Sequence, residues 1–226
     1  IGIAGLLGFR PTCQCPVVLT MNKNTVHTFD LKPRRWAAWL LTRFGWSYQF
    51  AQPPGPKAVV VVYPHTSNWD FLWGILVVWA SGWPLYWVGK HTLFVGPFGW
   101  VLRRWGGIPV NRTATAGFIE QVVDTMRSES HMLLVIAPEG TRRLTDRWKS
   151  GFYRIALGAD VPLGLAYIDY ATRQAGIYSY TALSGDEAKD MAHIASVYVG
   201  RRGYDPAKAA PIRLRPPTPE LTALDP

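Results

Sequence analysis

Residues 58–70 of the chain read AVVVVYPHTSNWD. The six apolar or aromatic residues at 58–63 have the length and the β-branched composition of a buried strand. The proline and small polar residues after them are typical of a loop that leads into a capped helix. We therefore predict a strand, a short loop that carries His65, and a helix whose first turn carries Asp70.

Elsewhere in the chain, apolar runs that suit strands alternate with segments that suit helices. The other expected strands are 85–88, 107–110, 132–137 and 161–167. The expected helices are 69–80, 94–104, 115–128, 150–158 and 184–199, with a hairpin near 161–180. This alternation predicts an α/β fold in which a mostly parallel sheet is flanked by helices.

The 226 residues fit one domain. We expect a poorly defined N-terminal segment at 1–30, the α/β domain at 31–203 and a loose, proline-rich tail at 204–226. The domain would open with an amphipathic helix at about 31–45. An uncharged run at 71–88 reaches the lower length limit of a membrane span, but glycines and a proline interrupt it. A buried helix followed by a buried strand is therefore the favoured interpretation.

The composition narrows the classes of function. The net charge is +9, and eleven residues are tryptophan. A basic chain suits nucleic acid, anionic lipid or phosphorylated substrates alike. No zinc-finger spacing or RNA-recognition signature accompanies the charge, so we expect no nucleic-acid partner. Cys13 and Cys15 form neither a disulfide framework nor part of a Cys/His ligand set, which predicts no metal site and a reducing compartment.

If the predicted strands are parallel, the polar groups that follow them meet at one edge of the sheet. His65 follows the first strand, Lys90 the second, Arg112 the third and the segment Glu139–Arg143 the fourth. Open α/β sheets bind ligands at the carboxyl ends of their strands. The sequence therefore predicts a single site built from four loops.

The spacing of His65 and Asp70 suits acid–base chemistry. Histidine is the natural base near neutral pH, because its ordinary pKa is about 6.5. Five positions turn an ideal helix by roughly 500°, so the two side chains can meet only if His65 lies in the loop and Asp70 in the first helical turn. His65 would then take a proton from a substrate hydroxyl while Asp70 orients the imidazole. The plainer alternative is a loop histidine beside an ordinary helix-start aspartate.

Basic residues near this edge suit an anionic substrate. Arg112 and Arg142 carry guanidinium groups, which bind phosphate through a fork of N–H donors. Gly140 and Thr141 make the turn beside Arg142 ready for an anion. Lys90 is a weaker candidate, because lysines after a strand are commonly plain surface residues.

Glu139 has two interpretations. It could bind a hydroxyl of the acceptor, or it could order the neighbouring arginines by ion pairing. We assign it to substrate binding rather than to a second catalytic base.

Taken in order, these motifs resemble the glycerolipid acyltransferase family, whose best-known members are the lysophosphatidic acid (1-acylglycerol-3-phosphate) acyltransferases. The family's first motif is a histidine, four residues and an aspartate, which His65 and Asp70 match. Its second motif is a strand that ends in a phosphate-binding arginine, which 107–112 resembles, and its third, Pro-Glu-Gly-Thr-Arg, is intact at 138–142. The fourth motif is altered, because 161–165 keeps the first of its two prolines and loses the second.

The resemblance implies transfer of a fatty acyl group from an acyl-CoA or acyl-carrier-protein thioester to a lysophospholipid hydroxyl, with 1-acylglycerol-3-phosphate as the favoured acceptor. His65 and Asp70 would be catalytic, and the substrate-binding residues would be Arg112, Glu139, Gly140, Thr141, Arg142 and Lys90. It implies no metal, no bound cofactor and no covalent acyl-enzyme. The alternatives are another lyso-lipid acceptor, a non-catalytic lipid- or anion-binding protein, and a thioester hydrolase.

Lipid substrates require access to a membrane. The segment 31–45 places Trp36, Leu40 and Phe44 at intervals of four among four basic residues. Such a helix could lie in the interface of an anionic bilayer, and the alternative is a helix that packs on the domain with solvated basic ends. We expect a peripheral enzyme on the cytoplasmic face of a bacterial inner membrane.

Overall fold

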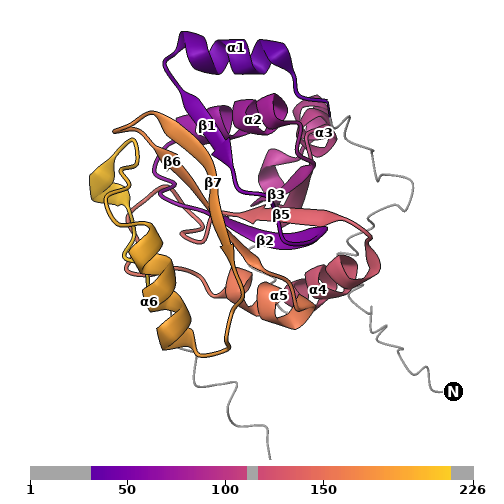
Figure 1. The fold of residues 1–226 in the computed structure, drawn as a ribbon. Helices are drawn as coiled ribbons and strands as arrows, with labels where there is room; N and C mark the ends of the chain where they lie inside the picture. Colours follow the sequence, from indigo (N-terminus) through magenta and orange to yellow (C-terminus); the bar gives the residue numbers. More distant parts are fainter. Residues whose placement is uncertain (1–31, 111–116, 215–226) are drawn as a thin grey trace, which may run out of the picture.

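A computed structural model describes residues 32–110 and 117–214, which form one seven-stranded sheet with helices on both faces (Figure 1). The strands are β1 (Ser47–Phe50), β2 (Lys57–Val62), β3 (Leu85–Lys90), β4 (Gly107–Val110), β5 (Met132–Ile136), β6 (Leu163–Asp169) and β7 (Gln174–Thr181). The helices are α1 (Arg35–Arg43), α2 (Trp69–Ser81), α3 (Gly96–Arg104), α4 (Phe118–Ser128), α5 (Gly151–Ala159) and α6 (Glu187–Val197), with short 3₁₀ turns η2 (His91–Leu93) and η3 (Pro206–Lys208). The N-terminal segment expected at 1–30 lies outside the described residues.

The strand order across the sheet is β1-β7-β6-β2-β5-β3-β4. β2 pairs in parallel with β5 and β6, β3 with β4 and β5, and β1 with β7. Among the described strands, β6 and β7 alone are antiparallel, and they form the hairpin expected near 161–180. The prediction of an α/β fold with a mostly parallel sheet is therefore confirmed. β1 was not predicted, because four residues, three of them exposed, do not distinguish an edge strand from a loop.

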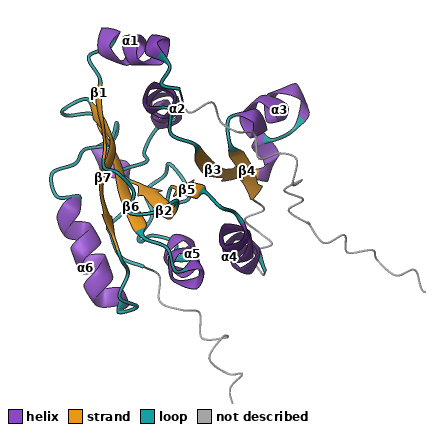
Figure 2. Ribbon diagram, turned by 45° about the vertical axis from the view of Figure 1, so that its right-hand side comes forward, coloured by secondary structure: helices purple, strands orange, loops and turns teal. Residues whose placement is uncertain are grey.

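The two faces of the sheet are covered by different helices (Figure 2). α4, α5 and α6 cover one face, where Val59 and Val61 pack with Leu134 of β5. α1 and α2 cover the other face, where Val62 packs against the α2 side chains. Side chains of a strand alternate between its two faces. The run at 58–63 is apolar throughout because both of its faces are buried.

The chain leaves β2 and β5 in opposite directions across the sheet. β2 leads through α2 to β3, whereas its neighbour β5 leads through α5 to β6 on the other side of β2. Adjacent parallel strands whose connections diverge in this way leave a crevice at their carboxyl ends. The loops after β2 and β5 carry His65 and Glu139, so the fold brings both residues to that crevice, as the argument from parallel strands predicted.

The uncharged run at 71–88 forms most of α2 and the start of β3, which confirms the expected helix followed by a strand. Gly82 ends α2 in the left-handed conformation, with φ of 72°, and Pro84 stands immediately before β3. In the ranges that the structure describes, no helix combines the length and the apolar character that crossing a membrane requires.

The segment 204–214 packs on the domain, where the sequence suggested a loose tail. The hydroxyl of Tyr63 donates a hydrogen bond to the carbonyl of Ala210 (3.0 Å), and Leu214 pairs with Trp148. The structure differs from the prediction here because prolines prevent a long regular helix but allow an irregular segment to pack. The remainder of the expected tail lies beyond the described residues.

Candidate active site

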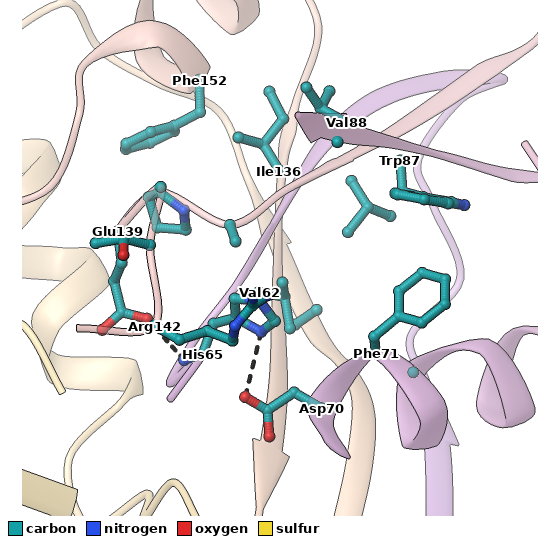
Figure 3. Close-up of a pocket in the computed structure, with 18 of the residues that line it drawn as sticks. Val62, His65, Asp70, Phe71, Trp87, Val88, Ile136, Glu139, Arg142 and Phe152 are labelled. Carbon is teal, nitrogen blue, oxygen red and sulfur yellow. Dashed lines mark hydrogen bonds and ion pairs between the residues drawn. The ribbon is translucent and has the colours of Figure 1, made fainter. Parts of the chain in front are cut away.

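The imidazole of His65 and the carboxylate of Asp70 meet at the carboxyl edge of the sheet (Figure 3). His65 Nδ1 lies 3.2 Å from Asp70 Oδ2. Nδ1 is buried and has no partner with hydrogen-bond geometry, so the two groups are in contact but not aligned. Contacts of this kind often tighten when substrate binds. The side chain of His65 keeps 18% of its surface exposed, whereas that of Asp70 is fully buried.

Asp70 lies in the first turn of α2, where its spacing from His65 requires it to be. Its Oδ2 also accepts a hydrogen bond from the backbone N–H of Ser67 (2.8 Å), and its Oδ1 accepts one from the hydroxyl of Tyr170 (2.7 Å). A buried carboxylate is costly unless it is paired or hydrogen-bonded, and these contacts supply its partners. The positive end of the α2 dipole also favours a negative charge at this position.

Glu139, in the loop after β5, forms hydrogen bonds to two segments that are distant in the sequence. Its side chain is 1% exposed; Oε2 accepts the backbone N–H of His65 (2.7 Å), and Oε1 accepts the backbone N–H of Ala210 (2.9 Å). Burial raises the pKa of Glu139 to about 7, although the two N–H donors oppose the shift. Both carboxyl oxygens therefore accept hydrogen bonds from backbone N–H groups, whereas the sequence suggested that Glu139 contacts substrate.

A cavity of about 1670 Å³ opens beside the His65–Asp70 pair. Its apolar wall lies between α2 and the sheet, and it includes Val60, Val62, Phe71, Gly74, Val135 and Ile168. Figure 3 shows Phe71 on one side of His65 and Glu139 on the other. The imidazole thus stands where an apolar compartment meets a polar rim.

A sequence model of the acyltransferase family matches residues 49–165, just over half of the chain. The chain belongs to the acyltransferase family. A solved structure with a similar fold is the 1-acyl-sn-glycerophosphate (LPA) acyltransferase PlsC from Thermotoga maritima, with a TM-score of 0.50 and 16% sequence identity over 72% of this chain and 73% of the PlsC chain. At that identity the likeness concerns the fold. No curated protein sequence matches this acyltransferase.

The basic residues predicted to bind phosphate follow different strands of the acyltransferase sheet. Lys90 ends β3 and Arg142 belongs to the loop after β5; both are exposed and line the cavity. Arg112 lies outside the described residues. Within the described parts of the acyltransferase, no cluster of three or more His, Cys, Asp or Glu side chains could hold a metal ion.

Gly140 and Thr141 shape the turn that presents Arg142. Gly140 has a φ of 66°, and a β-carbon added there would lie 2.8 Å from the side chain of Lys149. The left-handed conformation therefore favours glycine at this position, whereas the flexible end of the Lys149 side chain can shift. The hydroxyl of Thr141 accepts a hydrogen bond from the backbone N–H of Arg143 (3.3 Å), which closes the same turn.

Two contacts of the acyltransferase site were not anticipated from the sequence. Tyr170 lies a hundred residues from its partner Asp70, and Ala210 lies 71 residues from its partner Glu139. A signal for Tyr170 existed, because it follows β6, and the carboxyl end of β6 lies at the same edge as that of β2. Ala210 offered no signal, since it contributes a backbone N–H that any residue except proline would carry.

The raised pKa of Glu139 predicts a pH-dependent contribution to stability. Between the ordinary value of 4.5 and about 7, the folded state holds this proton more tightly than the unfolded state does. The free energy of unfolding should therefore fall as pH rises through this window. Glu139→Gln replaces the titrating carboxyl group with an amide. The free energy of unfolding of the wild type minus that of the variant should therefore decrease by up to about 3 kcal/mol between about pH 5 and about pH 8.

Urea denaturation of both proteins across this range measures the difference. The surface variant Glu187→Gln serves as the control, since Glu187 is exposed at the start of α6 and is not part of this site. A difference that is constant, or that grows with pH, would contradict the assignment.

Proposed function

We propose that this acyltransferase moves a fatty acyl group from an acyl-CoA or acyl-carrier-protein thioester to the hydroxyl of a lysophospholipid, with 1-acylglycerol-3-phosphate as the acceptor. The observation that carries the proposal is the contact between His65 Nδ1 and Asp70 Oδ2 (3.2 Å) at an apolar cavity. The contact supplies an oriented base, and the cavity supplies room for a hydrocarbon chain.

In the proposed reaction His65 acts through Nε2, because Nδ1 faces Asp70. Nε2 takes the proton of the acceptor hydroxyl as the hydroxyl oxygen attacks the thioester carbonyl. A C–O bond forms, the tetrahedral intermediate then collapses with cleavage of the C–S bond, and the departing thiolate takes the proton from the imidazolium. Asp70 stabilises the imidazolium between the two proton transfers. The acceptor supplies the nucleophile, so no covalent acyl-enzyme forms.

The apolar wall of the cavity suits a fatty chain. Val62, Phe71 and Ile168 lie on this wall, and His65 lines the same cavity. Burial of each methylene group contributes about 0.8 kcal/mol, so a long chain would hold its substrate firmly in this compartment. A thioester bound in this way would present its carbonyl near the imidazole.

The polar rim suits the phosphate of the acceptor. Arg142 and Lys90 are exposed there, and Arg112 is proposed as a third phosphate contact on the strength of its place in the motif. Glu139 enters the proposal as the anchor of the His65 loop rather than as a substrate contact, since both of its oxygens accept backbone N–H groups.

Two other functions would use the same residues. A thioester hydrolase would activate water in place of an alcohol, and a non-catalytic lipid-binding protein would need no base at all. The fully buried Asp70 behind His65 favours catalysis, because its contact orients an imidazole and adds nothing to the binding of a lipid. Release of CoA that depends on an added lyso-lipid separates transfer from hydrolysis.

His65→Ala should lower acyl transfer by roughly 10²- to 10⁴-fold, because it removes the base while leaving the cavity in place. CoA release from a palmitoyl thioester is measured with lysophosphatidate, with other lyso-lipids and without acceptor. His193→Ala, on the exposed surface of α6, is the matched control and should keep full activity. Retained turnover in His65→Ala would remove the proposed mechanism, and release of fatty acid without acceptor would favour the hydrolase.

Gly74→Leu should shorten the acyl chain that the enzyme accepts. A β-carbon at Gly74 would meet its nearest neighbour, Ile168 Cδ1, at 4.0 Å, so an added side chain projects into space that a chain would use. We expect kcat/KM for a palmitoyl thioester relative to an octanoyl thioester to fall about 10-fold or more. Gly74→Ala should leave the ratio unchanged, and an unchanged ratio in the leucine variant would place the acyl chain elsewhere.

We also propose that α1 and α3 contribute the surface that meets the membrane. Ala37 and Leu41 are buried on one side of α1, whereas Trp36 and Trp39 of the same helix are exposed. Trp100 is likewise exposed on α3. Exposed arginines accompany these side chains, namely Arg34, Arg35, Arg43, Arg103 and Arg104. Aromatic rings beside cations suit the interface of an anionic bilayer.

Trp39→Glu should weaken binding to vesicles that contain phosphatidylglycerol by about 10-fold, since it removes an interfacial ring and adds a repelled charge. Trp39 is 64% exposed, so the fold should tolerate the change. Val199→Glu adds the same charge at an exposed apolar residue just beyond α6 and should leave co-sedimentation unchanged. Equal losses in the two variants would argue against a specific membrane surface.

A further inference from the structure

Tyr170 lies outside every motif that supports the family assignment, although it contacts Asp70 of the first motif. Tyr170 directly follows β6, whereas the family model ends at residue 165. Its hydroxyl nevertheless lies 2.7 Å from Asp70 Oδ1. We propose that Tyr170 is a positioning residue for acyl transfer, which holds Asp70 so that Oδ2 faces Nδ1 of His65. This inference rests on the proposed function in one respect, namely that His65 is the base.

The two oxygens of Asp70 have different partners. Oδ2 contacts His65 Nδ1 (3.2 Å) and accepts the backbone N–H of Ser67 (2.8 Å), whereas Oδ1 accepts the hydroxyl of Tyr170. A carboxylate turns readily about its last torsion, whose energy wells are broad. One hydrogen bond at each oxygen fixes the plane of the group. Without the hydroxyl, Oδ1 would be a buried acceptor with no partner, and rotation toward another donor would become favourable.

The hydroxyl of Tyr170 is a permanent donor. Burial and the adjacent Asp70 both raise the pKa of Tyr170 above its ordinary value. The phenol therefore stays protonated throughout the range in which a histidine base works. An ionised carboxylate only accepts hydrogen bonds, so the direction of this bond is fixed.

The ring of Tyr170 is held by aromatic neighbours from two other segments. Trp46 contacts it edge-on with ring centroids 5.1 Å apart, and Tyr204 does so at 5.4 Å. Trp46 in turn stacks on Trp73 of α2 (4.9 Å). The backbone N–H of Tyr170 donates to the carbonyl of Arg202 (2.8 Å). The ring of Tyr170 is packed on two sides, and its backbone is hydrogen-bonded. Its hydroxyl therefore has little freedom to move away from Asp70.

The chemical consequence concerns the tautomer of His65. The negative charge of Oδ2 at 3.2 Å from Nδ1 favours the imidazole that carries its proton on Nδ1, which leaves Nε2 free to act as the base. If the carboxylate turns away, both tautomers become populated and fewer molecules present a basic Nε2. Tyr170 would therefore act on the base through Asp70, without touching substrate.

Tyr170→Phe keeps the ring and removes the hydroxyl. We expect kcat to fall about 10- to 100-fold, the size expected for a lost hydrogen bond to a charged group, with little change in KM for donor or acceptor. Nitrogen NMR of the isotope-labelled full chain should show His65 changing from the Nδ1–H form to a mixture of tautomers, with the signals assigned by their loss in His65→Ala. Tyr178→Phe, the same change at an exposed position of β7, should alter neither measurement.

A double-mutant cycle with Asp70→Asn separates positioning from a general structural effect. In that background there is no carboxylate to hold, so Tyr170→Phe should lower kcat by less than about 2-fold. Independent, multiplicative losses would overturn the inference, as would an unchanged His65 spectrum in Tyr170→Phe. The NMR spectrum can be recorded without turnover, so it tests the inference even if the wild-type protein transfers no acyl group. In that case the proposed function fails, and the spectrum still decides the role of Tyr170.

Discussion

The carboxylate of Asp70 has no exposed surface, so all of its hydrogen-bonding and charged partners must come from the protein. The other groups of the site supply these partners. The loop after β2 supplies an imidazole and a backbone N–H, and the turn after β6 supplies a phenol hydroxyl. These groups can converge because β2 and β6 are parallel neighbours whose carboxyl ends lie at the same edge. The position of the aspartate in the first turn of α2 adds a favourable dipole.

Two buried carboxyl groups at this edge serve different purposes. Asp70 contacts the side chain of His65, whereas Glu139 bonds to the backbone of the same residue. One interaction orients the ring and the other fixes the loop from which the ring extends. Burial disfavours the charge of Glu139 even with two N–H donors present, and it raises the pKa of this group to about 7. The histidine is thus constrained at both its side chain and its main chain.

The parts of this arrangement that sequence could predict are those with local signals. The apolar run at 58–63, the polar loop after it and the alternation of strands and helices were enough to place His65, Asp70 and Glu139 at one edge of a parallel sheet. The role of Glu139 was less accessible, because its partners are backbone N–H groups that no side-chain pattern encodes. Tyr170 required knowledge of which strand lies beside β2, and the order β6-β2-β5 becomes clear only when the sheet is assembled.

The bond between Glu139 and Ala210 also joins two parts of the chain that are synthesised at different times. A chain that emerges from the ribosome carries His65, Asp70 and Glu139 well before residue 210 has been made. Until then, Oε1 of Glu139 lacks its backbone donor, and the hydroxyl of Tyr63 lacks the carbonyl of Ala210 as its acceptor. The loop that carries His65 therefore gains this support, through Glu139, only after residue 210 has been synthesised.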